Sequence, residues 1–187
     1  MRFLFYTSIC LLLAIFSARA EEEKTLSYSS PDGRWKIVAS WVSDKDPGYQ
    51  GHYTYELQDI RLGKSYFKET DRNEDDKVLH PHRFSAYWSP NGRYVAINLY
   101  YGKIAYWVSM IDVAGKYPRE IPLFPKKMTD YDDFMTSTDR WLDGKSLEVE
   151  AYQPVNWSGS HIATAYKLVV RFEKDGAKVV RTEKEQL

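Results

Sequence analysis

The chain has 187 residues, with 26 basic and 26 acidic side chains and a formal net charge of zero. Because there is no basic excess, the composition excludes the electrostatic field by which proteins attract nucleic acids and anionic membranes. Aromatic residues make up 16% of the chain, which is ample material for the hydrophobic core of one domain.

The first 20 residues have the features of a secretory signal peptide. Arg2 precedes an apolar stretch at 3–16, and the segment ends in Ala-Arg-Ala at 18–20, a small-x-small cleavage pattern. The alternative is an uncleaved membrane anchor, for which the apolar stretch is short. We therefore predict cleavage after residue 20 and a periplasmic or secreted protein.

The chain that follows the signal, residues 21–187, is predicted to be a single domain with 24 basic and 26 acidic residues. Its chemistry is limited by the absence of cysteine, since Cys10 is the only one and lies in the signal. We therefore expect no disulfide, no thiolate metal site and no cysteine nucleophile. No cofactor is expected either.

One turn motif recurs along this chain. Ser-Pro-Asp/Asn-Gly-Arg-aromatic occurs at 30–35 and at 89–94, and a weaker copy, Trp-Leu-Asp-Gly-Lys, occurs at 141–145. Hairpin turns need positive φ, which glycine adopts freely, and a preceding proline fixes one turn dihedral in advance. The predicted structural turn residues are Pro31, Asp32, Gly33, Pro90, Asn91, Gly92, Asp143 and Gly144.

A second element follows each turn. Strand-like segments begin at Tyr53, Tyr106 and Tyr166, and each ends in a glycine-containing turn before a return strand. The sequence therefore predicts three antiparallel β-meander units, at about 24–69, 82–123 and 137–183. We expect an all-β fold, with a helical turn allowed only at 131–138.

These repeats resemble the WD40-like repeats of TolB-type β-propellers, whose blades open with an aromatic-Ser-Pro-Asp-Gly-Arg hairpin. The resemblance rests on 30–38 and 88–97, and on the later strands Tyr53–Asp59 and Tyr106–Asp112. Propellers usually close with four to eight blades, and only three units are present here. Three arrangements remain open: a curled propeller fragment, a β-sandwich or irregular barrel, and a homodimer in which two chains complete one another.

His80 and His82 are the candidate metal ligands. In an extended segment alternate residues project to the same side, so two imidazoles could bind zinc or copper with a carboxylate such as Asp75 or Asp76. The competing interpretation is a surface loop, because Pro81 separates the histidines and no third ligand is defined.

Three further groups are candidate binding residues. Asp132 and Asp133 could bind calcium or act as an acid–base pair on glycans, although their spacing also suits helix capping. His161 ends a serine-containing segment that lacks the glycines of a nucleophile elbow. Tyr49 and Trp157 lie in predicted loops, where aromatic residues form sugar platforms or protein-binding hot spots.

The sequence favours a non-enzymatic binding domain whose partner is a protein or another envelope macromolecule. TolB-like relatives act with envelope complexes, and the resemblance implies the same kind of role. The alternative is an envelope-glycan-binding module or hydrolase that uses Asp132, Asp133 or His161 beside exposed tryptophans. No nucleic-acid partner is expected, and after cleavage no segment is expected to be an integral membrane anchor.

Overall fold

The computed structural model describes residues 23–42, 53–70, 84–101, 105–125, 134–154, 162–174 and 176–185. The described residues form strands joined by turns and bends and contain no helix, which confirms the all-β prediction. The strands are β1 (Glu23–Ser29), β2 (Trp35–Val42), β3 (Tyr53–Asp59), β4 (Lys64–Thr70), β5 (Ser85–Trp88), β6 (Tyr94–Tyr101), β7 (Ala105–Asp112), β8 (Arg119–Ile121), β9 (Met135–Trp141), β10 (Ser146–Pro154), β11 (Ile162–Glu173) and β12 (Gly176–Glu185).

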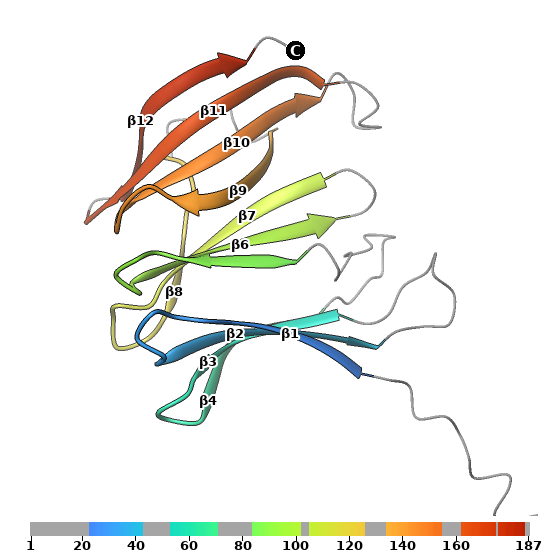
Figure 1. Ribbon diagram of the computed structural model, residues 1–187, viewed down its shortest axis with the longest axis vertical. Helices are drawn as coiled ribbons and strands as arrows, with labels where there is room; N and C mark the ends of the chain where they lie inside the picture. Colours follow the sequence, from blue (N-terminus) through green and yellow to red (C-terminus); the bar gives the residue numbers. More distant parts are fainter. Residues whose placement is uncertain are drawn as a thin grey trace, which may run out of the picture.

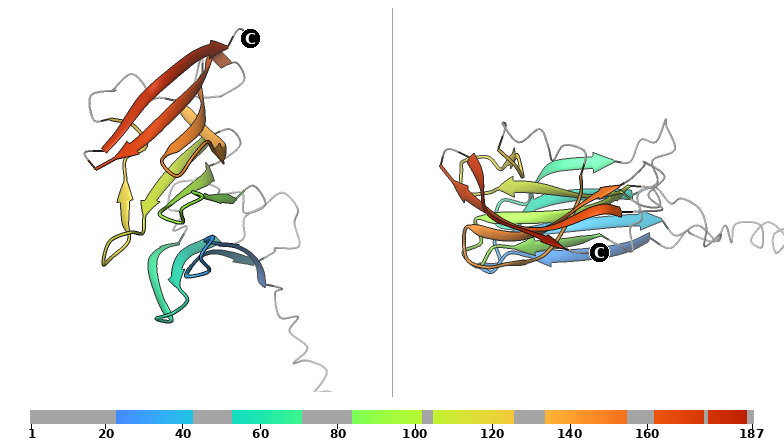
Figure 2. Two further views of the ribbon diagram at one scale, coloured as in Figure 1. Left: turned by 60° about the vertical axis from the view of Figure 1, so that its left-hand side comes forward. Right: turned by 90° about the horizontal axis from the view of Figure 1, so that it is seen from above.

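The strands form three four-stranded antiparallel sheets, each a meander of consecutive strands. Sheet 1 contains β1–β4, sheet 2 contains β5–β8 and sheet 3 contains β9–β12, and none of them closes into a barrel. The sheets lie in a row along the longest axis of the molecule, with sheet 2 in the middle (Figure 1). Seen along the row, the sheets are stacked face to face (Figure 2).

The stack is held by two hydrophobic cores, one on each side of sheet 2. Successive residues of β6 point to opposite faces, so Val95 and Ile97 pack against sheet 1 while Tyr94 and Ala96 pack against sheet 3. Both faces of sheet 2 are therefore buried, which explains the nearly continuous apolar run at 94–97. Each fully buried Val or Ile contributes about 1.5–3 kcal/mol of transfer free energy.

The three sheets have equivalent faces, defined by the residue that follows each turn motif, and these faces all point in the same direction along the stack. We call this arrangement head-to-tail packing. In sheet 1 the face with Trp35 and Ile37 meets sheet 2, and in sheet 2 the face with the corresponding Tyr94 meets sheet 3. The corresponding face of sheet 3 points outward and is polar. There, Glu148 is buried beneath Arg140, whose hydrogen bond holds the pKa of that carboxyl below its usual value.

The first two turns have the same geometry. Gly33 and Gly92 both have φ of +67°, as the motif predicts. In each turn a serine at the start accepts a hydrogen bond at its Oγ from the backbone N–H of the aromatic residue, Ser30 from Trp35 and Ser89 from Tyr94. The shared shape of the two loops thus depends on the serine as well as on the glycine.

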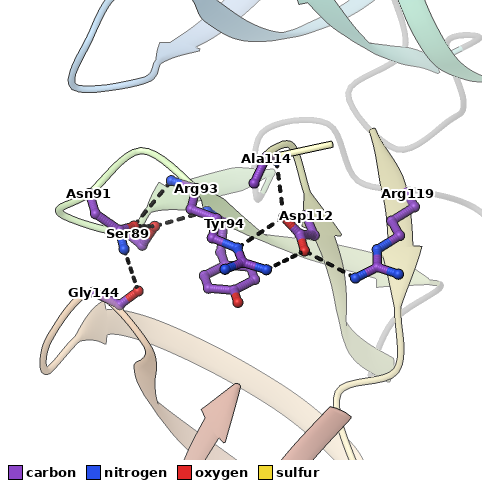
Figure 3. A network of polar contacts seen from close by, with 8 residues as sticks. All are labelled: Ser89, Asn91, Arg93, Tyr94, Asp112, Ala114, Arg119 and Gly144. Atoms are coloured by element: carbon purple, nitrogen blue, oxygen red, sulfur yellow. Dashed lines mark hydrogen bonds and ion pairs between the residues drawn. The ribbon is translucent and has the colours of Figure 1, made fainter. Parts of the chain in front are cut away.

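The third turn is one residue shorter, and glycine has a different role in it. The strand-end hydrogen bond runs from Leu142 N–H to Ser146 C=O, over four positions, whereas Ser30 N–H reaches Trp35 C=O over five. Gly144 is not among the glycines with positive φ, so the expectation of a left-handed backbone at that residue is wrong. A Cβ at Gly144 would lie 2.8 Å from Nδ2 of Asn91, which donates a hydrogen bond to Gly144 C=O (Figure 3). Glycine is therefore required at position 144 because Asn91 of the second turn lies too close to leave room for a Cβ.

Alanine substitutions separate the two roles of glycine. Gly33→Ala meets no atom within 4 Å, so we expect a loss of about 1 kcal/mol from the left-handed backbone alone. Gly144→Ala adds no such strain, but Asn91 must move and lose its hydrogen bond, which costs about 1 kcal/mol. An Asn91→Ala background should therefore relieve Gly144→Ala and leave Gly33→Ala unchanged in urea unfolding. Equal effects in both backgrounds would contradict the close-approach explanation.

The helical turn allowed at 131–138 is wrong over its described part. Met135–Trp141 is strand β9, paired with β10, and its buried side chains include Met135, Thr136 and Thr138. Polar residues dominate this strand because its hydroxyls bond neighbouring backbones: Thr138 Oγ1 donates to Glu148 C=O. Residues 131–133 lie outside the described residues.

Candidate functional site: a groove at the β7 edge

The candidate binding and metal residues predicted from the sequence all lie outside the described residues. They are Tyr49, His80, His82, Asp132, Asp133, Trp157 and His161, and they stay predictions. Within the described part of the chain, no group of three or more His, Cys, Asp or Glu residues is arranged to hold a metal ion. The eight turn residues are all described and lie at the β1–β2, β5–β6 and β9–β10 connections.

A groove lies where the chain leaves sheet 2. β8 has only three residues and pairs with β7 from Met110 to Asp112. The earlier residues of β7 therefore have a strand neighbour on the β6 side only. Beside them is a groove of about 480 Å³, bounded across from β7 by Phe134 and Thr136 of the β9 region. This volume lies in the range typical of ligand sites.

The groove has an apolar floor and an aromatic rim. Val108 and Met110 are buried in the floor, and the buried Phe134 lies across from them. Trp107 stands at the rim with 53% of its surface exposed. A large aromatic side chain left exposed beside an apolar groove is the usual composition of a recognition hot spot.

Two prolines fix the wall that follows β8. Pro122 and Pro125 flank Leu123 and Phe124, which pack half-buried against the core between sheets 2 and 3. Because proline fixes φ and has no N–H, this segment cannot continue as a paired strand. The prolines thus end β8 early and leave the groove beside it.

The polar groups of the groove are few, and two of them already have partners. Thr136 Oγ1 accepts a hydrogen bond from the N–H of Val108 at 3.1 Å, which satisfies that backbone donor at the β7 edge. Ser109 Oγ donates to Glu120 Oε1, also at 3.1 Å. Glu120 is exposed, is the only ionisable residue among the described residues of the lining, and forms no ion pair with any of them or with the rest of the described chain. The groove therefore carries one negative charge at its mouth.

The neighbouring end of sheet 2 is fixed by a buried carboxylate (Figure 3). Asp112 accepts hydrogen bonds from Arg93, Arg119 and the backbone N–H of Ala114. Burial acts to raise the pKa of Asp112, but these donors and the positive charges outweigh it and the pKa lies below its ordinary value. The ion network sets the position of β8, and hence that of Glu120.

A second, shallower groove follows the edge strands β1, β5 and β9. Its aromatic residues also join the sheets, because Nε1 of Trp88 donates to Tyr28 C=O and Nε1 of Trp141 donates to Tyr87 C=O. Asp139 and Arg140 lie at its sheet 3 end. The two tryptophans are therefore both structural and accessible from this side.

The sequence pattern does not single out Trp107 and Glu120 as site residues. Trp107 is one of six tryptophans, most of which the pattern assigns to the core or to cross-strand pairs. The signal that could have revealed it is local: the segment 117–125 contains three prolines around a three-residue strand, too short to cover β7. Such an interruption marks where a sheet edge is left incomplete.

Comparisons with known proteins give little further information. No protein-family model matches this chain, and no curated protein matches it. A solved structure titled "AtxE2 Isopeptidase - APO" is similar at a TM-score of 0.42 with 13% identity. The match covers 83% of this chain and 28% of that one, so this chain spans little more than a quarter of its length. No helix in the described part of this chain is long and apolar enough to span a membrane.

Proposed function

We propose that this chain is a non-enzymatic binding domain, exported to the periplasm or secreted, that holds a protein partner in the groove beside β7. The exposed Trp107 at the edge of an apolar groove is the observation that carries the proposal. The described residues of the lining include no histidine, cysteine or lysine and only one carboxylate, a composition that suits recognition better than acid–base or nucleophilic catalysis.

We also propose that the scaffold is an incomplete TolB-type propeller with three blades. The repeated turn geometry supports this: Arg34 and Arg93 each follow the turn glycine, stack over the next aromatic ring at 4.8 Å, and reach an aspartate on the third strand of their sheet. The head-to-tail packing of the sheets supports it further. A scaffold of this kind presents its edges and loops to partners.

Replacing Trp107 tests the proposed function. A pull-down from an envelope fraction should capture a specific partner with the wild-type chain, and Trp107→Ala should weaken the purified complex by about 30-fold or more. Because the side chain is half exposed, the free energy of unfolding should change by less than about 1 kcal/mol.

Tyr117→Ala is the matched control, since Tyr117 is an aromatic of the β7–β8 connection that is 63% exposed and is not among the residues that line the groove. The control should bind as the wild type does. A partner captured equally by both variants would place the binding surface elsewhere on the molecule.

A glycan-binding function is the second candidate, and the groove along β1, β5 and β9 favours it. Tyr28, Tyr87, Trp88 and Trp141 line that groove together with Asp139. Aromatic faces beside a carboxylate are suited to stacking sugars and accepting their hydroxyl hydrogen bonds. Saturable changes in tryptophan fluorescence with envelope oligosaccharides, retained in Trp107→Ala, would support this candidate over the first.

A further inference from the structure

We infer that the partner presents a basic side chain next to a large apolar one, the cation lying between Trp107 and Glu120 and the apolar group entering the groove. This inference deepens the proposed function and rests on it. It follows from the relative positions of three side chains of sheet 2 and from the distribution of charge in the groove.

Trp107, Ser109 and Glu120 form a row on one face of sheet 2. Trp107 and Ser109 are alternate residues of β7 and so share a face. Glu120 is paired with Ile111, the next residue of that face, and reaches back to Ser109. Ser109, itself buried, therefore lies between the indole and the carboxylate, and the row is on the face of β7 opposite Val108 and Met110.

A cation is the group that suits this position. An ammonium or guanidinium gains from the face of an indole and from a carboxylate, and these attractions act together when both lie on one side. No described cation takes the place: Arg119, the neighbour of Glu120, bonds to Asp112 instead. Within the described part of the chain, the carboxylate at the mouth of the groove has no cation beside it, and a basic group of a partner would neutralise it.

An apolar side chain is the complement of the remaining surface. Beyond Glu120 the groove is walled by Ile121, Leu123 and Phe124, and its floor is Val108 and Met110. A sugar would need several hydrogen-bonding groups here, but the hydroxyl of Thr136 accepts from Val108 N–H and that of Ser109 donates to Glu120. The two halves of the site are on opposite faces of β7, and neighbouring residues of an extended peptide also point to opposite faces. A peptide lying along the β7 edge with Arg or Lys next to Leu, Phe or Trp therefore satisfies both halves of the site.

A random peptide library displayed on phage, panned against the whole purified protein, tests the inference. Selected peptides should be enriched in an Arg or Lys adjacent to a large apolar residue. For a synthetic peptide of the selected sequence, Glu120→Gln should weaken binding about fivefold and reduce its dependence on salt. Glu120→Lys should weaken it further and should select acidic peptides from the same library.

The outcomes separate this inference from the proposed function. One outcome is that the selected peptides lack a basic residue, fail to bind Trp107→Ala, and bind Glu120→Gln as well as the wild type. That result would refute the proposed cation position and would leave the groove as a binding site. Peptides that bind Trp107→Ala as well as the wild type, or a library that yields no binder, would overturn both. Oligosaccharide binding abolished by Trp107→Ala, without peptide binding, would replace the peptide by a glycan.

Discussion

Phe172→Ala is expected to lower the free energy of unfolding by about 4 kcal/mol, a large fraction of the total stability of most single domains. Phe172 is 2% exposed and lies between sheets 2 and 3, with its ring 5.5 Å from that of Tyr94 and 5.9 Å from that of Trp141. Removing it leaves a cavity between two sheets that are joined mainly by such contacts. Chemical denaturation followed by far-ultraviolet circular dichroism measures the loss.

The repeat supplies matched controls at the same position of the other two sheets. The N–H groups of Ile60, Val113 and Phe172 bond to the carbonyls of Arg34, Arg93 and Lys145, so the three residues are equivalent. Val113 is buried between sheets 1 and 2, whereas Ile60 is 50% exposed on the outer face of sheet 1. Val113→Ala should cost about 2 kcal/mol and Ile60→Ala less than about 1 kcal/mol.

This order of effects follows from the head-to-tail stack and not from side-chain size alone. If Ile60→Ala proved as costly as Val113→Ala, the outer face of sheet 1 would have to be covered in solution. A second copy of the chain would be the first partner to examine, because a homodimer is one arrangement expected from the three units. Sedimentation of the wild type would then show a dimer.

The strands are predictable from the sequence because their signals are local. Alternation and turn chemistry place 35–42, 53–59 and 94–101 on strands without knowledge of any distant contact. The same rules allow a helical turn at 131–138, because the hydroxyls that make β9 a strand bond to residues far along the chain. Thr136, for example, bonds to Val108 of β7.

The groove could not be predicted in this way, since no one segment contains it. The groove requires a short β8, the connecting segment that Pro122 and Pro125 fix, and β9 of sheet 3 as its far wall. Each part is visible in the sequence, but their proximity depends on how sheets 2 and 3 stack. The loop residues that the sequence singles out instead, such as Tyr49 and Trp157, lie outside the described residues.

The poor match of the third turn to the repeated motif also has a physical explanation, which the spacing of residues in the sequence does not show. In sheets 1 and 2 the residue opposite the aromatic is an aspartate, Asp59 or Asp112, but opposite Ser146 it is Arg171. Arg171 pairs with Asp143 at 3.9 Å, and both side chains are about half exposed. An exposed pair of this kind contributes little, so the third turn has lost the ion pair that fixes the other two.

Asp112→Ala is therefore expected to cost about 3 kcal/mol, the second large effect. Asp112 is 3% exposed, and without it Arg93 and Arg119 lose their carboxylate while Ala114 N–H loses its acceptor. Removing one partner of a buried ion pair usually costs 3–5 kcal/mol, and we take the lower end, about 3, because both guanidinium groups reach solvent. Asp139→Ala, an exposed aspartate of sheet 3, should change stability by less than about 0.5 kcal/mol.

The pH dependence of Asp112→Asn distinguishes a lost charge from lost packing. The pKa of Asp112 is lower in the folded chain than the value of about 3.9 expected on unfolding, so its ionised form favours folding. That contribution is complete above about pH 4 and is lost as the pH falls through the folded pKa. The difference in melting temperature between wild type and Asp112→Asn should thus be largest near neutral pH and shrink below pH of about 4. A difference that stays constant from neutral to acidic pH would mean that Asp112 acts by shape and not by charge, and the ion network would then not be what positions β8 and Glu120.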